Sequence, residues 1–454
     1  MWPSVGMWTS TYFLIILCVA LRTVFSDDEK AVQFCTEDAN ANDLKFNCLC
    51  PSVNDTLIIQ DKKISYGKSH INIPDNVTCW RIVGCSAVHL SGTTLTSLKH
   101  IHTLQLHKID HIHLAYDFFL QYNTPLETLQ LSHSTFEGTE GSLNIHAHNL
   151  KIITLEDIIW KGQLNILIQI QEGHVLDLVS IKNCKIEVLG EINLSPRYVH
   201  TFALENNYIG TVSTGAIIQE SEKTIIHHNY VGYLSFLSLD TDTHNFTLQA
   251  NTIKNVALES LVVSNATFIQ IINNEFFHIE SFGLTSLHST SQEGSMVFSD
   301  NIFHKHEPGS LIFYSTVFNK KLIIQNNVFK STNCNCSFLS YIRKMTEIND
   351  SVTHSFTGER EKAYELFIDS SLCFDKERKY KLSYLCKESE LNHYWVFPAI
   401  ALVTIMFTGL LVTVVINRHM CSAKYTRLFM ESEEMDQHKT HSVSAIEKII
   451  YIKE

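Results

Sequence analysis

An asparagine recurs at nearly regular intervals through the middle of the chain, each time after a short run of alternating apolar residues. Successive asparagines are 22, 22, 23, 27 and 26 residues apart. They are Asn207, Asn229, Asn251, Asn274, Asn301 and Asn327. A repeat of this length is typical of a solenoid, in which each repeat forms one turn and packs on its neighbours. The chain is therefore predicted to be mainly β and to form a stack of parallel turns.

Each repeat predicts one short strand followed by a turn. Alternating apolar residues such as Phe202 and Leu204 give a strand with one buried face. The amide of the next asparagine has both donors and an acceptor, so it can bond the backbone of its own turn and of the adjacent one. Stacked asparagines are thus expected to form a ladder that satisfies backbone groups at the bends.

The same pattern continues upstream with other residues at the asparagine position. They are Cys184, Ile158, Ser134, Ile109 and Cys85. Counting from Cys85 to Asn327 predicts a parallel β-solenoid of about eleven turns over residues 81–333. At the usual spacing of strands it is about 50 Å long.

The repeat resembles two known families. One is the extracellular leucine-rich repeat, with the pattern LxxLxLxxNxL; the other is the right-handed parallel β-helix of the pectin-lyase-like type. The leucine-rich pattern needs an apolar residue eight positions before the asparagine, as at Val199 but not at Ser221 or Thr243. Later repeats carry a second apolar run instead, such as GAIIQ and ESLVV. The resemblance therefore favours a right-handed β-helix, with a leucine-rich-repeat-like solenoid as the alternative.

Cysteines cluster on both sides of the repeats. Those before it are Cys35, Cys48, Cys50 and Cys79, and those after it are Cys334, Cys336, Cys373 and Cys386. The segments FNCLCP and CNCSFLSYI resemble the terminal caps of leucine-rich-repeat ectodomains. We expect caps at 27–80 and 334–393, each with two disulfides of open connectivity. Cys85 and Cys184 lie four turns apart, roughly 19 Å, too far for a disulfide, so both are expected to be buried free thiols.

Two apolar segments predict the membrane topology. Residues 1–26 read as a secretory signal peptide, with an apolar run at 12–21 that is too short to cross a bilayer. Residues 395–416 are uncharged and long enough for a transmembrane helix. Arg418, Lys424 and Arg427 follow directly, which puts 417–454 in the cytosol. The chain is thus expected to be a single-pass type I protein of the plasma membrane.

Seven N-x-Ser/Thr sequons support an extracellular N-terminal part. They are Asn54, Asn76, Asn193, Asn245, Asn265, Asn335 and Asn349, and all precede the second apolar segment. This one-sided distribution predicts a glycosylated ectodomain.

The cytosolic tail carries two short signals. Cys421 lies next to the bilayer, where palmitoylation is expected. Tyr425 and Leu428 frame the sequence YTRL, which resembles the Tyr-x-x-apolar sorting signal and makes a clathrin adaptor the expected cytosolic partner.

Several classes of function are disfavoured. A net charge of -12 argues against nucleic acid as a partner. The 24 histidines include the cluster His107, His111 and His113, but no HExxH or comparable metal pairing, so neither metal nor cofactor is expected. Glu275 and Asp300 stand beside ladder asparagines without a matching acidic partner, and no hydrolase or kinase motif is present. The chain is therefore not expected to be an enzyme.

The sequence predicts a cell-surface binding protein, an adhesion molecule, receptor or co-receptor for an extracellular protein or glycan. An endocytic or secretory-pathway cargo receptor is the alternative, because of YTRL. A glycan-active β-helix enzyme is the third and weakest reading.

Overall fold

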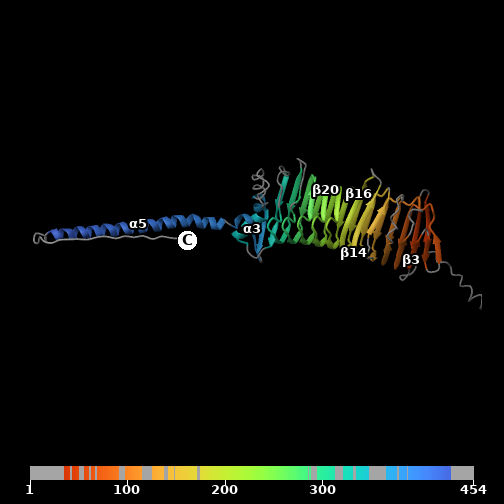
Figure 1. Cartoon of the computed structure of the whole chain (residues 1–454), viewed down its shortest axis with the longest axis horizontal. Coiled ribbons are helices and arrows are strands. Elements are labelled where there is room, and N and C mark those ends of the chain that lie inside the picture. The colour runs from red at the N-terminus through yellow and green to blue at the C-terminus, as the bar shows by residue number, and fades with distance from the viewer. Residues whose placement is uncertain are drawn as a thin grey trace, which may run out of the picture. The chain divides into compact units, whose positions relative to one another are not determined.

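The computed structural model describes residues 35–40, 43–50, 56–60, 63–66, 69–91, 98–114, 125–137, 142–147, 149–170, 174–284, 286–287, 294–311, 321–330, 334–346, 365–375, 378–385 and 387–430. The predicted signal peptide and most of the cytosolic tail lie outside these ranges. The chain forms two units, Met1–Leu385 and Cys386–Glu454. The first is a parallel β-solenoid (Figure 1).

One face of the solenoid, the first face, consists of the strands that precede the repeated asparagine position. They are β2 (Asp43–Leu49), β6 (Cys79–Val83), β8 (Thr103–His107), β10 (Thr128–Ser132), β13 (Ile152–Glu156), β15 (Leu176–Lys182), β16 (Lys185–Glu205), β18 (Ile217–His227), β20 (Leu239–Gln249), β23 (Phe268–Ile272), β26 (Ser295–Ser299) and β28 (Lys321–Gln325). Each pairs in parallel with the next. The eleven strands from β6 to β28 carry the eleven predicted ladder positions, but the solenoid comprises about eight turns, fewer than the eleven predicted.

The second face consists of the strands that follow the asparagine position. They are β3 (Thr56–Gln60), β7 (Ala87–Ser91), β9 (His111–Leu114), β11 (Thr135–Glu137), β14 (Ile159–Gln169), the start of β16, β17 (Tyr208–Val212), β19 (Tyr230–Leu234), β21 (Thr252–Val256), β24 (Glu275–Ile279), β27 (Ile302–His306), β29 (Val328–Lys330) and β30 (Leu372–Asp375). These strands are also paired in parallel from each turn to the next.

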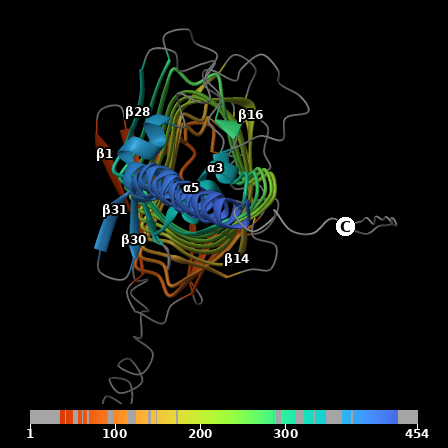
Figure 2. The same cartoon turned by 90° about the vertical axis from the view of Figure 1, so that its left-hand side faces the viewer.

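A third face closes the turns in the middle of the stack. It contains β12 (Ser142–His146), parts of β14, β16, β18 and β20, then β22 (Leu261–Ser264) and β25 (Ser286–Leu287). A parallel bridge between Leu284 and Leu311 continues it. From one end the turns lie one behind another around a common interior (Figure 2). Several strands per turn are what the second apolar run predicted.

The corner between the first and second faces requires a left-handed residue in every turn. The residue just before each ladder position has a positive φ, from 51° at His133 to 58° at Asp300 among the non-glycine residues. These residues are Lys108, His133, Asp157, Asn183, Asn206, His228, Ala250, Asn273, Asp300 and Asn326, with Gly84 in the first turn. This conformation bends the chain sharply between the two faces, and the ladder side chain that follows is buried in the core.

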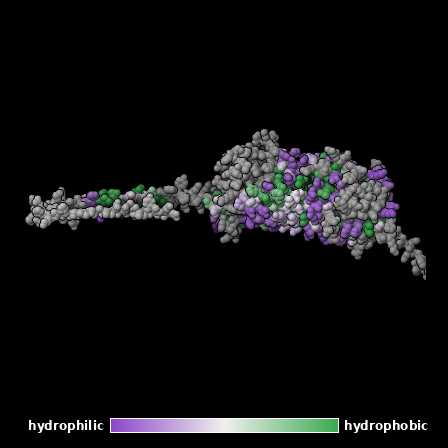
Figure 3. Space-filling model, in the orientation of Figure 1, coloured by the Kyte–Doolittle hydropathy of each residue, from purple (hydrophilic) through white to green (hydrophobic). Residues whose placement is uncertain are grey.

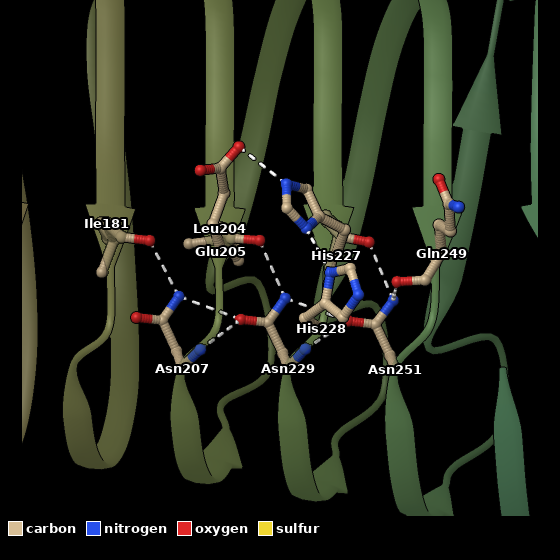
Figure 4. Close-up of polar contacts among 10 residues, drawn as sticks. Ile181, Leu204, Glu205, Asn207, His227, His228, Asn229, Gln249 and Asn251 are labelled. Atoms are coloured by element: carbon tan, nitrogen blue, oxygen red, sulfur yellow. Dashed lines mark hydrogen bonds and ion pairs between the residues drawn. The ribbon is translucent and has the colours of Figure 1, made fainter. Parts of the chain in front are cut away.

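The asparagine ladder has one repeated geometry (Figure 4). The side-chain nitrogen of Asn229 donates to the carbonyl of Leu204 in the preceding turn at 2.8 Å, and its oxygen accepts from the backbone nitrogen of Asn207 at 2.9 Å. The same pattern joins all six predicted asparagines, and every one of them is buried. Upstream, the hydroxyl of Ser134 accepts from the backbone nitrogen of Ile109 at 3.1 Å. This shorter side chain thus makes one of the inter-turn hydrogen bonds that the asparagines make.

Apolar columns fill the interior next to the ladder. Ile209, Val231 and Ile253 are buried two positions after their ladder asparagines. The next three turns put phenylalanine there, and Phe303 stacks between its two neighbours with ring centroids 5.4 and 5.0 Å apart. Each turn is therefore held by burial of apolar area against both adjacent turns.

The N-terminal end corrects the expected cysteine pattern. β1 (Cys35–Asn40) forms an antiparallel hairpin with β2, closed by a disulfide between Cys35 and Cys48. The second disulfide joins Cys50 to Cys85, with Cα atoms 5.0 Å apart. The prediction that Cys85 is a free thiol is wrong, because β2 already pairs in parallel with β6 and so brings Cys50 beside the first ladder position.

Cys79, expected to pair inside this cap, takes no part in these two bridges and lies in β6, in register with Lys45. The hairpins of β3 with β4 (Lys63–Tyr66) and of β4 with β5 (Ser69–Asn72) complete this end.

The C-terminal end is closed by a helix and a hairpin. α3 (Cys336–Thr346) begins after Asn335, whose side-chain oxygen accepts from the backbone nitrogen of Phe338 at 3.1 Å. A disulfide joins Cys334 to Cys373 on β30, which pairs with β31 (Arg378–Lys381), and η2 (Leu382–Tyr384) follows. Cys336 is also disulfide-bonded, and Cys386 lies outside the described residues. A helix and a hairpin here shield the last open turn, as a solenoid end requires.

Cys184, by contrast, is a buried thiol at a ladder position, as predicted. Its backbone nitrogen donates to the side-chain oxygen of Asn207 at 2.8 Å, and its thiol donates to the carbonyl of Lys182 at 3.2 Å. Burial raises the pKa of this thiol to about 12. It therefore ends the asparagine ladder on the N-terminal side without reactive thiolate character.

The second unit contains α5 (Lys387–Met430). Within it, Pro398–His419 is long and apolar enough to cross a membrane, three residues later at each end than the predicted span. Apolar side chains from Ile400 to Ile416 are exposed. Such a surface on an isolated helix is typical of a segment that lies in a bilayer.

Candidate binding surface on the outside of the solenoid

The register of the first face aligns its outward side chains into columns along the solenoid. The middle column holds the residue four positions before each ladder residue, and it begins with Arg81. Its other members are Gln105, Gln130, Thr154, Ser180, Ala203, Ile225, Thr247, Gln270, Val297 and Ile323. None of these ten residues is charged. We call them the neutral column.

The neutral column presents small and amide side chains on a flat sheet. Ala203 is buried, Ile323 is 46 % exposed, and the others are half-buried. The side-chain nitrogen of Gln105 donates to the side-chain oxygen of Gln130 at 2.8 Å, so neighbouring turns are also linked on the outside. The cores of protein interfaces are similarly depleted of charge. On the side of the solenoid in view in Figure 3, hydrophobic and hydrophilic residues are interleaved.

The adjacent outward column, next to the corner, is polar and partly charged. His227 and Glu205 form an ion pair between neighbouring turns, with Nε2 and Oε1 2.8 Å apart (Figure 4). Closer to the N-terminus, Nδ1 of His107 lies 2.8 Å from the hydroxyl of Ser132. Glu205 and His227 of this column therefore bind each other, whereas the neutral column carries no charged side chain.

The second face carries a stack of rings and cations. The rings of Tyr208 and Tyr230 are parallel at 4.8 Å, and the ammonium of Lys254 lies 3.1 Å from the ring centroid of Phe277. Phe277 also stacks on His304 at 4.2 Å. Because these groups contact each other, the stack stabilises the outer surface between turns.

The histidines pair with carboxylates of neighbouring turns. The pairs with the shortest distances are His304–Glu275 at 2.7 Å, His227–Glu205 at 2.8 Å and His133–Asp157 at 3.0 Å. His111 and His113 lie on β9, where His113 stacks on His89 at 4.4 Å. In the described ranges, the histidines, cysteines and acids form no group of three that could hold a metal ion. The inter-turn pairing was missed from the sequence, because it depends on the register between turns.

The two acidic residues considered for catalysis have structural surroundings. Burial opposes the charge on Glu275, but hydrogen bonds from His304 and Lys330 lower the pKa of its carboxyl below the usual value. Asp300 is one of the left-handed corner residues, with φ 58°. They lie in consecutive turns, Asp300 directly before its ladder asparagine and Glu275 directly after its own, and Glu275 is paired with a histidine and a lysine.

The sequons in the described ranges are distributed along the solenoid and its ends. Asn76, Asn193, Asn265 and Asn335 are exposed, and Asn245 is half-buried on the first face. Asn54 and Asn349 lie outside the described residues. Asn193 donates to Glu191 at 3.0 Å, and Asn265 donates to Asp242. The exposed side chains are accessible to glycosylation.

The tail signals fall at the end of α5. Cys421, Tyr425 and Leu428 belong to its helical backbone, and their side chains are outside the described part of the chain.

Comparison with models of known protein families, with curated proteins and with solved structures finds no match for this chain.

Proposed function

We propose that this chain is a single-pass type I glycoprotein of the plasma membrane, whose solenoid binds an extracellular protein or glycan as an adhesion molecule, receptor or co-receptor. The neutral column carries this proposal. It runs along ten consecutive parallel strands of the first face and presents hydroxyl, amide and methyl groups on the outside. The disulfides at both ends suit an oxidising compartment, and the apolar segment of α5 suits a membrane anchor.

Binding is favoured over catalysis for a physical reason. A glycan-active enzyme needs acids placed on both sides of a scissile bond, whereas Glu275 is held by a histidine and a lysine. We also propose that the turns wind in the right-handed sense, as in the parallel β-helices that the repeat resembles.

Topology is tested with the full chain carrying an epitope tag after Glu454. On intact cells, an antibody raised against the solenoid should stain the surface, whereas the tag should be reached only after permeabilisation. Removal of N-glycans should increase the electrophoretic mobility of the mature protein. Intracellular retention of the whole population would favour the cargo-receptor alternative.

Binding is tested with the full chain in lipid nanodiscs displayed on beads, applied to intact cells. Gln270→Glu puts a charge into the neutral column at a residue outside every sequon. Thr252→Glu puts the same charge on β21 of the second face. We expect the first change to reduce bead capture by cells and the second to leave it unchanged. Equal capture by both variants would remove the neutral column from the binding surface.

A further inference from the structure

A hollow of about 350 Å³ lies on the outside of the first face near its N-terminal end. It is lined by Lys45, Asn47, Thr78, Cys79, Arg81, His102, Thr103 and Gln105. These residues come from three neighbouring turns, on or just before β2, β6 and β8.

The lining forms a regular grid because the three strands are in parallel register. Lys45, Cys79 and Thr103 are partners in one column. In the next column the partners are Asn47, Arg81 and Gln105. Lys45 and Arg81 are diagonal neighbours, about 7–8 Å apart at the backbone, so both cationic groups can reach one anion placed between them.

The hollow is positive although the chain is strongly negative overall. Lys45, Arg81 and His102 contribute basic groups, and among the described residues no carboxylate belongs to the lining. Glu127 lies beside it, with Oε1 3.6 Å from Nδ1 of His102. The same carboxylate is paired with Lys151 at 3.0 Å, so it leaves the positive charge of the hollow largely uncompensated.

The neutral column leads directly away from this hollow. Gln105 lines the hollow and bonds Gln130 in the next turn, and Thr154 and Ser180 continue the line. Amides and hydroxyls in a row are suited to the hydroxyls of an extended sugar chain. The guanidinium of Arg81 offers the planar fork that binds carboxylate or sulfate with two hydrogen bonds.

We propose that the hollow binds the acidic group of an anionic saccharide, a sugar chain bearing sulfate or carboxylate groups, whose neutral part lies along the neutral column. The anion is held between Arg81 and Lys45, and Asn47, Thr103 and Gln105 contact the adjacent sugar. This proposal rests on the extracellular binding function proposed above and names its ligand class.

The test measures binding of fluorescent oligosaccharides to the full chain in lipid nanodiscs. The probes are a heparin-derived octasaccharide, a sialic-acid-terminated hexasaccharide and an uncharged hexasaccharide; a glutamate-rich peptide is the fourth probe. Arg81→Gln and Lys45→Gln remove the proposed contacts. Lys223→Gln is the matched control, because Lys223 projects from the same face in the same column as Lys45, several turns away.

We expect one or both acidic saccharides to bind, with affinity that falls as salt is raised. Arg81→Gln should weaken binding at least about tenfold, and Lys223→Gln should change it less than about twofold. The relative binding of the sulfated and sialylated probes identifies which acidic group is preferred. Thermal unfolding of each variant is measured alongside, and unchanged unfolding of Arg81→Gln assigns its loss to the site.

Three results would overturn the proposal: equal binding of the uncharged probe, equal effects of Arg81→Gln and Lys223→Gln, or binding of the glutamate-rich peptide in preference to both acidic saccharides. None of these results affects surface staining or the response of bead capture to Gln270→Glu. Failure of this site and failure of the general binding function are therefore distinguishable.

Discussion

The side-chain oxygen of Asn251 accepts two hydrogen bonds from Asn229, one from its backbone nitrogen at 2.8 Å and one from its side-chain nitrogen at 3.0 Å. The side-chain nitrogen of Asn251 in turn donates to the carbonyl of Ile226 at 2.8 Å. One buried amide thus satisfies a backbone donor and a backbone acceptor on the same neighbouring side, at a bend where water has no access.

Replacing Asn251 with leucine should therefore destabilise the middle of the solenoid. The variant leaves the nitrogen of Asn229 and the carbonyl of Ile226 without these partners, at about 1–3 kcal/mol each. We expect limited proteolysis to cut near this turn and the amount of mature protein to fall. Thr252→Ala, at a half-exposed neighbour, should stay within about 0.5 kcal/mol. Similar behaviour of the two variants would contradict a structural role for the ladder.

Ala250→Gly should stabilise the protein. Ala250 occupies a left-handed corner with φ 54°, a conformation that costs an alanine about 1–2 kcal/mol and a glycine almost nothing. Part of this gain is lost to the greater freedom of glycine in the unfolded chain, so we expect a net rise of up to about 1 kcal/mol in the free energy of unfolding.

The control is Ala203→Gly, in the first-face part of β16 near its end, where glycine should destabilise by roughly 0.5–1 kcal/mol. Chemical denaturation of the two variants measures both effects. The prediction fails if both glycines shift the unfolding midpoint in the same direction.

The disulfide between Cys50 and Cys85 should hold the N-terminal end onto the solenoid. It links residues 35 positions apart, and closing a loop of that length stabilises by about 3–4 kcal/mol. Peptide mapping of the non-reduced protein should recover the cross-linked pair. Cys85→Ser should make the N-terminal strands the first site of proteolysis, and a map that instead joins Cys50 to Cys79 would show that the pairing is different.

Cys184 should resist alkylation in the folded protein. Burial raises the pKa of its thiol to about 12, so almost no thiolate forms at neutral pH. Iodoacetamide should label it only above the denaturant concentration at which the solenoid unfolds. Labelling in native buffer, at the rate of an exposed cysteine, would show that this turn opens.

Acid should weaken the C-terminal turns through His306. The ring lies 5.2 Å from that of Phe329, and burial lowers its pKa from 6.5 to about 4. Between pH 6.5 and pH 4 the histidine of the unfolded chain binds a proton more readily than the buried one. The contribution of neutral His306 to the free energy of unfolding is therefore fully present above pH 6.5 and is lost as the pH falls toward 4. The contribution is of the order of 3 kcal/mol.

His306→Phe should remove most of this dependence, whereas His200→Gln, at an exposed histidine, should leave it in place. Thermal unfolding measured from pH 7 to pH 4.5 separates them. Parallel curves for His306→Phe and the native protein would rule out this histidine as the cause.

The repeat could be predicted because each turn encodes its own geometry. A strand, a left-handed corner and an asparagine are local, and their spacing alone aligns Asn207 with Asn229. The partner of Cys85 could not be found in this way, since it depends on β2 stacking directly before β6. The expectation that cap cysteines pair among themselves treated the cap as separate from the solenoid, whereas the parallel stack already begins at β2.

The candidate binding surface could be predicted from the sequence only in part. The neutral column can be read from the sequence once its position relative to the ladder is known, four residues earlier. The hollow could not be predicted from the sequence, because its basic groups belong to three different turns. They lie close together only because β2, β6 and β8 are adjacent in the sheet. The same holds for pairs such as His304 and Glu275, which are 29 residues apart.

The side-chain nitrogen of every ladder asparagine donates to a carbonyl of the preceding turn, and in all but the last, Asn327, it also donates to the side-chain oxygen of the next asparagine. A duplicated turn inserted anywhere in this series would meet the same partners on both sides. Duplication of one repeat of 22 to 27 residues can therefore lengthen such a protein in steps of about 4.8 Å. Because of the ladder, the length of the solenoid can change during evolution by whole turns, while the residues at its two ends stay the same.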